Sequence, residues 1–323
     1  MTHRSIPSRA LFACLVLVFA QSRAAAQDDG APLPDGVQGY SLIGKALVSP
    51  PPDRETLDKL DTARIEYERD PTDADNIIWY GRRMAYTGDY RGAIRIFSEG
   101  IARHPQDARM YRHRGHRYIS VREFDRAIED LEHASKLIEG GHNRIEPDGM
   151  PNALNIPVST LHGNIWYHLG LAYYLKHDWP NAWRAFQAGF ETGGNDDNRV
   201  STTHWRYMIL RRMGKAGEAR GVLDDISADM NVIENIVYHR LCLFYKGELT
   251  LTDMTAEDPD NPTGAAEAYG LANWFFYNGD KALARRHLEA LTASPGWDSF
   301  GYIAAEADLA FMDAPATSVE ASH

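Results

Sequence analysis

The fold is decided by two adjacent stretches of 34 residues. Residues 74–107 read ADNIIWYGRRMAYTGDYRGAIRIFSEGIARHPQD, and residues 108–141 read ARMYRHRGHRYISVREFDRAIEDLEHASKLIEGG. A glycine–alanine pair recurs at the same places in both, as Gly81 with Ala93 and as Gly115 with Ala127. A period of 34 residues is typical of one helix–turn–helix unit stacked on the next. The chain is therefore predicted to be an all-α solenoid of antiparallel helix pairs that presents an extended surface.

A third pair, Gly170 with Ala182, follows the second after 55 residues, which is one period and 21 further residues. The extra residues form an insert at 141–161. Its apolar side chains are Met150, Leu154, Ile156 and Val158. A segment of this length inside a compact array is usually functional or ordered by packing. We therefore expect the insert to fold over the concave surface and to narrow the groove between the second and third units.

The units share further landmarks besides the glycine–alanine pairs. In the third unit these landmarks are Trp166, Leu169, Gly170, Tyr173, Ala182 and Phe186. This succession of aromatic, Leu-Gly, Tyr, Ala and Phe positions resembles the tetratricopeptide repeat (TPR) family. The resemblance implies a right-handed superhelical solenoid in which the first helix of every pair lines a concave surface.

The resemblance covers a TPR-like helical array at residues 53–310. Full repeats are expected at about 74–107, 108–141 and 163–196, and divergent ones at about 200–233 and 265–298. A helix capped by Asp53 is expected to occupy the second-helix position of an incomplete first unit. Residues 232–246 are predicted to add an extra helix, and residues 297–309 a final capping helix.

Both ends of the chain are predicted to lie outside the array. Residues 1–26 contain two early arginines, an apolar run of 11 residues and Ala24-Ala25-Ala26, which is the order of a signal peptide cleaved after Ala26. Export to the periplasm or beyond the cell follows, with membrane contact only through this peptide before cleavage. Residues 27–52, rich in glycine and proline, are predicted to form a flexible arm. Residues 311–323 are predicted to form a disordered tail.

Composition limits the classes of partner. The chain has 45 acidic and 34 basic residues and a net charge of −11, and cleavage of the signal peptide would remove three arginines and no acid, leaving −14. An acidic chain is a poor candidate for nucleic-acid binding, which requires a basic face. Cleavage would also leave Cys242 as the single cysteine, which we expect to be a small buried side chain because free cysteines are usually found in cores.

No recognised chemical motif is present. The sequence contains no phosphate loop, no dinucleotide fingerprint and no Gly-x-Ser-x-Gly motif, so neither an enzyme nor a cofactor is expected. His113 and His116, near His142 and His162 of the insert region, have a helical spacing that could share a metal. However, no carboxylate or cysteine completes a known ligand spacing, and no metal site is predicted.

The TPR resemblance indicates which residues of each first helix face the concave surface. At these positions the chain carries Arg82, Tyr86, Arg109, Arg112, His116, Asn164, Tyr167, Tyr174, His204, Arg211 and Arg212, with Met208 among them. The predicted groove is therefore basic and aromatic within an acidic chain. Arginine favours planar recognition of carboxylates, and tyrosine supplies apolar area with a polar tip. The lysine–asparagine clamp that the family uses for chaperone tails is missing, since Ile78, Arg82 and His113 occupy its positions.

The function that follows is non-catalytic binding. The concave groove is expected to hold an acidic or aromatic-rich segment of a protein or peptide partner in the cell envelope, as a scaffold or adaptor would. One alternative is a binder or enzyme for a small anionic molecule, with the insert as a lid and His116 or His204 as an acid–base group. Another alternative is a structural module that associates with itself. The sequence does not identify the partner or the oligomeric state.

Overall fold

The computed structural model describes residues 32–254 and 262–314. By its contacts the chain divides into Met1–Pro32 and Leu33–His323, and every element described below lies in the second unit. The predicted signal peptide, the first residues of the predicted arm and residues 315–323 of the predicted tail lie outside the described residues. Among the helices of the described ranges, none combines the length and apolarity needed to cross a membrane.

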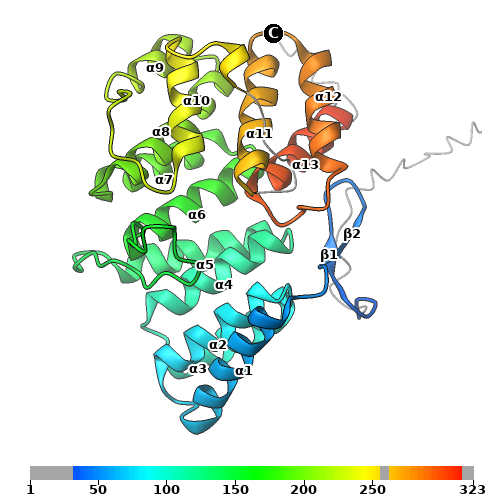
Figure 1. Cartoon of the computed structure of the whole chain (residues 1–323), viewed down its shortest axis with the longest axis vertical. Coiled ribbons are helices and arrows are strands. Elements are labelled where there is room, and N and C mark those ends of the chain that lie inside the picture. The colour runs from blue at the N-terminus through cyan, green and yellow to red at the C-terminus, as the bar shows by residue number, and fades with distance from the viewer. Residues whose placement is uncertain (1–31, 255–261, 315–323) are drawn as a thin grey trace, which may run out of the picture. The chain divides into compact units, whose positions relative to one another are not determined.

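Three helix pairs form the regular part of the array (Figure 1). They are α2 (Ala74–Tyr86) with α3 (Tyr90–Arg103), α4 (Ala108–Ser120) with α5 (Phe124–Leu137), and α6 (Leu161–Leu175) with α7 (Trp179–Thr192). They are preceded by α1 (Arg54–Arg69), which packs on α2 and is capped by a hydrogen bond of 2.7 Å from Thr56 N to Asp53 Oδ1. The all-α architecture of antiparallel helix pairs is thus as predicted.

The recurring glycines mark the closest approach within each pair. A Cβ atom added to Gly81 would lie 2.5 Å from Phe97 Cε1, which is far inside van der Waals contact. The equivalent distances are 2.8 Å from Gly115 to Leu131 Cγ and 2.6 Å from Gly170 to Phe186 Cδ2. Any side chain at these positions would push the two helices apart or displace the opposing ring, so the repeat needs glycine there.

The turns inside the three pairs share one left-handed residue. The angle φ is +84° at Gly88, +65° at Arg122 and +57° at His177, so these positions repeat the spacings of 34 and 55 residues. Glycine adopts this conformation freely, whereas other residues adopt it at a cost of roughly 1–2 kcal/mol. Arg122 and His177 therefore need compensating contacts, and both find them on the last helix of the chain.

The second half of the array is less regular. Its elements are α8 (Asp196–Arg212), α9 (Ala216–Gly221), α10 (Ile236–Lys246), the 3₁₀ helix η1 (Leu251–Asp253), α11 (Pro262–Tyr277), α12 (Lys281–Thr292) and α13 (Phe300–Asp313). The fourth unit was expected to have a full second helix, but α9 has only six residues, because Gly217 and Gly221 weaken this segment as a helix. The extra helix, α10, packs against α8 and α11, and its Cys242 is buried as expected.

The last helix folds back onto the array. It packs against α11 and α12 and also reaches α6. Its Glu306 forms an ion pair with Arg122, its Asp308 forms an ion pair with Arg212, and His177 Nε2 lies 3.1 Å from Asp308 Oδ1. The helix continues to Asp313, so the predicted tail begins later than residue 311.

The predicted flexible arm is corrected by the structure. Within it, β1 (Val37–Tyr40) and β2 (Ala46–Val48) form an antiparallel hairpin, and Leu47 is only 1% exposed. The hairpin joins the two ends of the array, since Ser49 Oγ donates to Gly88 O at 2.9 Å and Trp297 Nε1 donates to Val48 O at 2.8 Å. The glycine- and proline-rich composition is typical of a linker, but these long-range contacts order the segment.

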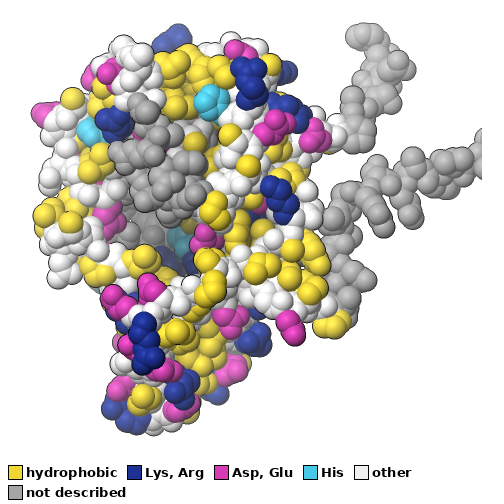
Figure 2. Space-filling model, turned by 45° about the vertical axis from the view of Figure 1, so that its right-hand side comes forward, with side chains coloured by type: hydrophobic (Ala, Val, Ile, Leu, Met, Phe, Trp, Pro, Cys, Tyr) yellow, Lys and Arg dark blue, Asp and Glu magenta, His cyan; other side chains and the backbone are white. Residues whose placement is uncertain are grey.

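The end of the array that α1 to α3 form carries charges of both signs. Figure 2 shows acidic and basic side chains interspersed over the end of the array formed by α1 to α3. Most of them belong to exposed pairs within α1, such as Arg64 with Glu68 at 2.9 Å. Exposed pairs of this kind contribute little to stability, about 0–1 kcal/mol each. This surface therefore has no strong field of one sign.

Candidate binding cleft

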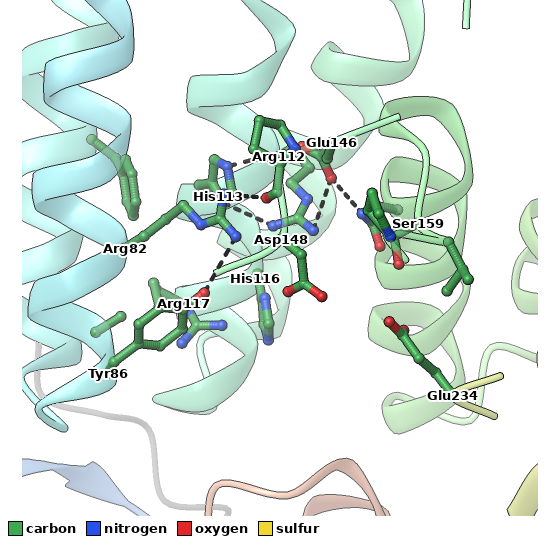
Figure 3. A pocket seen from close by; sticks show the side chains of 16 residues that line it. Arg82, Tyr86, Arg112, His113, His116, Arg117, Glu146, Asp148, Ser159 and Glu234 are labelled. Atoms are coloured by element: carbon green, nitrogen blue, oxygen red, sulfur yellow. Dashed lines mark hydrogen bonds and ion pairs between the residues drawn. The ribbon is translucent and has the colours of Figure 1, made fainter. Parts of the chain in front are cut away.

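The largest concentration of charged side chains around one cavity lies between α2, α4, α6 and the insert (Figure 3). This central cavity has a volume of about 200 Å³. It shares Asn164 and Glu234 with a hollow of about 260 Å³, which is bounded by the start of α8 and by residues 234–238. On the other side, past Tyr86 and Arg117, it opens into a hollow of about 730 Å³ beside the start of α13. We call these three neighbouring spaces, which share lining residues, the cleft.

The insert forms one wall of the cleft. Its two arms run side by side, with Glu146 N donating to Ser159 O at 3.0 Å. Arg82 Nη1 donates to Pro147 O at 2.8 Å, and Arg83 Nη1 donates to Gly149 O at 3.0 Å, which ties the insert to α2. The insert therefore contacts α2, the first helix of the first pair, whereas the sequence predicted a position between the second and third units.

Polar contacts, and not apolar packing, hold the insert there. Its large apolar side chains Met150, Leu154 and Ile156 are exposed. Instead, the backbone of the insert lies close to α2, since a Cβ atom on Gly149 would lie 2.3 Å from Tyr86 Oη. Glycine at this position lets the insert rest directly on α2.

Glu146 is the buried anchor of the insert. Its carboxylate lies 3.0 Å from Arg112 Nη2 and also accepts a hydrogen bond from Asn164 Nδ2. Arg112 Nη1 donates to His113 Nδ1 at 2.7 Å, which leaves the proton of a neutral His113 on Nε2. Burial nevertheless lowers the pKa of Arg112, and the Glu146 charge opposes that effect only in part. Glu146 and Arg112 thus serve mainly to fix the wall of the cleft.

Arg117 has no such partner. Its side chain lines the central cavity and the hollow beside α13, and within the described ranges it makes no hydrogen bond and no ion pair. Its nearest aromatic neighbour is Tyr90, whose ring centre lies 5.3 Å from the Arg117 Cζ atom. Arg117 is half-buried, and burial lowers its pKa, while the negative charge of Asp298, which lines the same hollow, acts in the opposite direction.

Arg82 adds a second available cation. It donates to the Pro147 carbonyl and, at 3.3 Å, to the Tyr86 hydroxyl, but forms no ion pair with a carboxylate of the described chain. Arg82, Tyr86 and Arg117 lie together on the α2 and α4 side of the cavity in Figure 3. Two guanidinium groups beside a hydroxyl are suited to binding a carboxylate or another oxyanion.

The histidines of the cleft are neutral. Burial, followed by nearby arginine charges, lowers the pKa of His113 and His168 well below 6.5. The pKa of His116 is lowered in the same way by burial, Arg117 and His168. The ring centres of His116 and His168 lie 4.2 Å apart, and Phe300 from the start of α13 packs against both. These rings therefore contribute hydrogen-bonding nitrogens and not charge.

Carboxylates balance the arginines of the central cavity. These carboxylates were not predicted from the sequence. The central cavity is lined by Arg82, Arg112 and Arg117, and also by Glu146, Asp148 and Glu234. The groove was predicted to be basic because its positions were taken from the repeats alone. The acids come from the insert and from the loop before α10, neither of which belongs to the repeat.

Six of the predicted groove residues line the cleft, namely Arg82, Tyr86, Arg112, His116, Asn164 and Tyr167. Two are instead core residues, since Tyr174 and His204 are each 1% exposed. Tyr174 bonds to Tyr269, and His204 packs against Tyr245, because α10, α11 and α13 cover the α6 and α8 surface that we expected to be open.

The remaining predicted arginines have other partners. Arg109 forms ion pairs with Asp75 and Asp107, away from the cleft. Arg211 donates to Tyr207 and Asn278, and Arg212 binds Asn273 and Asp308. Met208 is buried. The predicted place of these residues in the groove is thus corrected: for Met208, Arg211 and Arg212 because the fourth unit is covered, and for Arg109 because it is held by Asp75 and Asp107.

Sequence reasoning also overlooked Arg117. Arg83 and Arg117 are 34 residues apart, and both line the hollow beside α13, so the period itself contained the signal. The resemblance drew attention to neighbouring positions instead. Among the residues that the structure describes, no three histidine, cysteine, aspartate or glutamate side chains are grouped as a metal site requires.

No family model and no curated protein matches the chain. Among solved structures, it is similar to YrrB, described as a TPR protein with an unusual peptide-binding site, at 15% identity and a TM-score of 0.41, over 72% of this chain and 92% of that one. It is also similar to a chain of the APC/C hetero-tetramer Cut9–Hcn1, at 14% identity and a TM-score of 0.34, over 78% of this chain and 46% of that one. The helix pairs and their glycine contacts give the described chain an all-α fold of TPR type.

Proposed function

We propose that this protein is a non-catalytic binding protein of the cell envelope, whose cleft holds an extended segment of a protein partner. The observation that carries the proposal is Arg117, a desolvated guanidinium in the cleft that has no acceptor within the described residues. Because Arg117 is half-buried and forms no ion pair with a described carboxylate, a ligand carboxylate that reached it would gain a charge-assisted hydrogen bond at a reduced cost of desolvation.

The shape of the cleft supports an extended ligand. Its three spaces run in succession past α2, α4, α6 and the start of α8, so a peptide could follow them from one hollow to the next. Polar side chains along this path, such as Asn164 and Asn198, offer hydrogen bonds to a peptide backbone. Export through a signal peptide and residence in the periplasm or outside the cell are parts of the same proposal.

A small anionic molecule is the second candidate. The central cavity is small and the insert forms its wall, which suits a compact ligand with the insert as a lid. His116 lines this cavity as a neutral imidazole and could exchange a proton with such a ligand. His204 is set aside for that role because it is buried among aromatic side chains.

Calorimetric titration can test the proposal. The probe is a capped pentapeptide with one glutamate among glycines, and free glutarate represents the small anion. Arg117→Gln should weaken peptide binding by about tenfold, the effect of one charge-assisted hydrogen bond. The matched control is Arg95→Gln, the same change at an exposed arginine of α3 outside the cleft, which should leave binding unaltered. Equal binding by Arg117→Gln and the parent would refute the proposal, and binding of glutarate alone would favour the second candidate.

A further inference from the structure

The cleft contains two carboxylates that have no basic partner. Asp148 lines the central cavity, and its carboxylate accepts a backbone hydrogen bond from Met150 N at 2.9 Å. Glu234 stands at the rim and accepts a hydrogen bond of 2.6 Å from Asn152 Nδ2. Neither forms an ion pair with a lysine, arginine or histidine of the described ranges. In Figure 3 the two carboxylates are turned toward the space between them.

A second acidic residue, Asp197, fixes the backbone around Glu234. Asp197, buried at the start of α8, accepts hydrogen bonds from Ile233 N, Glu234 N and Asn235 N at 2.9, 2.8 and 2.8 Å. Asn152 then links the Glu234 side chain to the insert, which carries Asp148. Both carboxylates therefore belong to segments that are tied down by several hydrogen bonds.

Nearby negative charges affect Glu234, although this residue is exposed at the rim of the cleft. Partial burial raises the pKa of Glu234, and the negative charges of Asp148 and Asp197 raise it further, while the hydrogen bond from Asn152 acts in the opposite direction. Like charges held near one another disfavour ionisation, and a nearby cation relieves the repulsion. No described side chain supplies that cation.

Two arginines that form no ion pair with a described carboxylate line the same cavity. Arg82 and Arg117 come from α2 and α4, whereas Asp148 and Glu234 come from the insert and from the loop before α10. Charges of opposite sign normally pair when side chains can reach each other. Here no ion pair joins these arginines to these carboxylates within the described chain, so the cleft has a basic and an acidic set of side chains, which we call its two walls.

We infer that the cleft recognises a segment carrying both charges, with a carboxylate bound by Arg82 and Arg117 and an ammonium or guanidinium bound by Asp148 and Glu234. The inference rests on the proposed function and narrows its ligand, since an acidic segment alone would satisfy only one wall. The same chemistry occurs in a peptide with neighbouring glutamate and lysine side chains and in a free amino acid with separated charges.

Calorimetric titration with three capped peptides tests this inference. One carries a glutamate and a lysine separated by glycine, a second has glutamine in place of the lysine, and a third has glutamine in place of the glutamate. The peptide with both charges should bind about tenfold more tightly than either of the others, because a second charge-assisted contact forms. Free 6-aminohexanoate, with hexanoate as its control, represents the small-molecule source.

Matched variants then assign each charge to its wall. The double variant Asp148→Asn with Glu234→Gln should abolish the preference for lysine and keep the affinity for the acid-only peptide. Arg117→Gln should weaken both glutamate peptides and spare the lysine-only peptide. Near-ultraviolet circular dichroism should show that both variants remain folded.

The outcomes separate the two proposals. Equal binding of the acid-only and the doubly charged peptide would overturn the inference and leave the proposed function standing. Binding of 6-aminohexanoate, but of no peptide, would support recognition of two charges and overturn a peptide partner. Absence of binding by all of these probes would overturn the inference.

Discussion

The guanidinium of Arg122 and the carboxylate of Glu306 form a buried two-point ion pair across 184 residues of sequence. Nε and Nη2 of Arg122 lie 3.0 and 2.8 Å from the two Glu306 oxygens, and the side chains are 2% and 0% exposed. Arg122 Nη2 also donates to Trp297 O. The turn between α4 and α5 is thereby fixed to α13.

Removing one member of this pair should strongly destabilise the fold. Glu306→Gln leaves the Arg122 charge buried without its counterion, which typically costs about 3–5 kcal/mol. Urea denaturation followed by circular dichroism measures the change in the free energy of unfolding. Glu68→Gln, in the exposed pair with Arg64, is the control and should change that free energy by no more than about 1 kcal/mol. A similar small loss for Glu306→Gln would contradict the structural importance of the pair.

Two glycine-to-alanine substitutions should act in opposite directions. Gly81→Ala places a methyl group 2.5 Å from the Phe97 ring, so we expect a loss of about 1–3 kcal/mol through overpacking. Gly217→Ala lies in α9 with no neighbouring atom within 4 Å, and alanine should stabilise the helix by about 0.5–1 kcal/mol. Thermal and urea denaturation of both variants provides the comparison. Stabilisation by Gly81→Ala would show that the helices of this pair can separate easily.

Arg117→Gln should weaken ligand binding without lowering the stability of the fold. Because burial lowers the pKa of Arg117, its charged form is disfavoured in the folded protein, and neutral glutamine relieves that cost. We expect the variant to lose affinity for a glutamate peptide while its melting temperature stays the same or rises slightly. Differential scanning calorimetry in the absence of ligand measures the second property. A large fall in melting temperature would indicate that Arg117 is a structural residue.

Stability should decrease as the pH falls below about 6.5, partly because of His204. Burial lowers the pKa of His204 to about 3, so the unfolded chain binds a proton near pH 6.5 that the folded protein takes up only near pH 3. Between these values one such group lowers the free energy of unfolding by about 1.4 kcal/mol for each pH unit.

His204→Phe should remove this contribution to the slope. Urea titrations at several pH values between 6.5 and 4.5 should show a flatter dependence than the parent, by about 1.4 kcal/mol per pH unit. Loss of the hydrogen bond between His204 and Tyr245 would add an offset but no slope in this range. His142→Gln, at an exposed histidine, is the control, and an unchanged slope for His204→Phe would contradict the burial of a neutral imidazole.

The regular half of the fold could be predicted because its determinants are local. Gly81 meets Phe97 only 16 residues later, and the same step recurs in the next two pairs, so the pattern is visible in the sequence. The hairpin and the return of α13 depend on contacts such as Val48 with Trp297, which no period encodes. A composition rich in glycine and proline therefore predicted a flexible arm where an ordered hairpin exists.

The residues of the candidate site also fall into two groups, those that the repeat places and those that tertiary contacts place. Arg82, Arg112 and His116 could be placed from the repeat register, because each stands on the first helix of a regular pair. Asp148 and Glu234 could not, since they lie on the insert and on a loop whose positions are set by tertiary contacts. Tyr174 and His204 were misplaced because the sequence does not show which faces the last helices cover.

The left-handed turn residues give this array a fixed number of units. Repeat arrays commonly evolve by duplicating or deleting a unit, since each unit contacts only its neighbours. Here Arg122 and His177, at equivalent turns of two successive pairs, contact Glu306 and Asp308 on one helix. A unit gained or lost between α7 and α11 would move that helix out of reach of both turns. Adding or deleting a unit there would therefore break the contacts of both turns with α13.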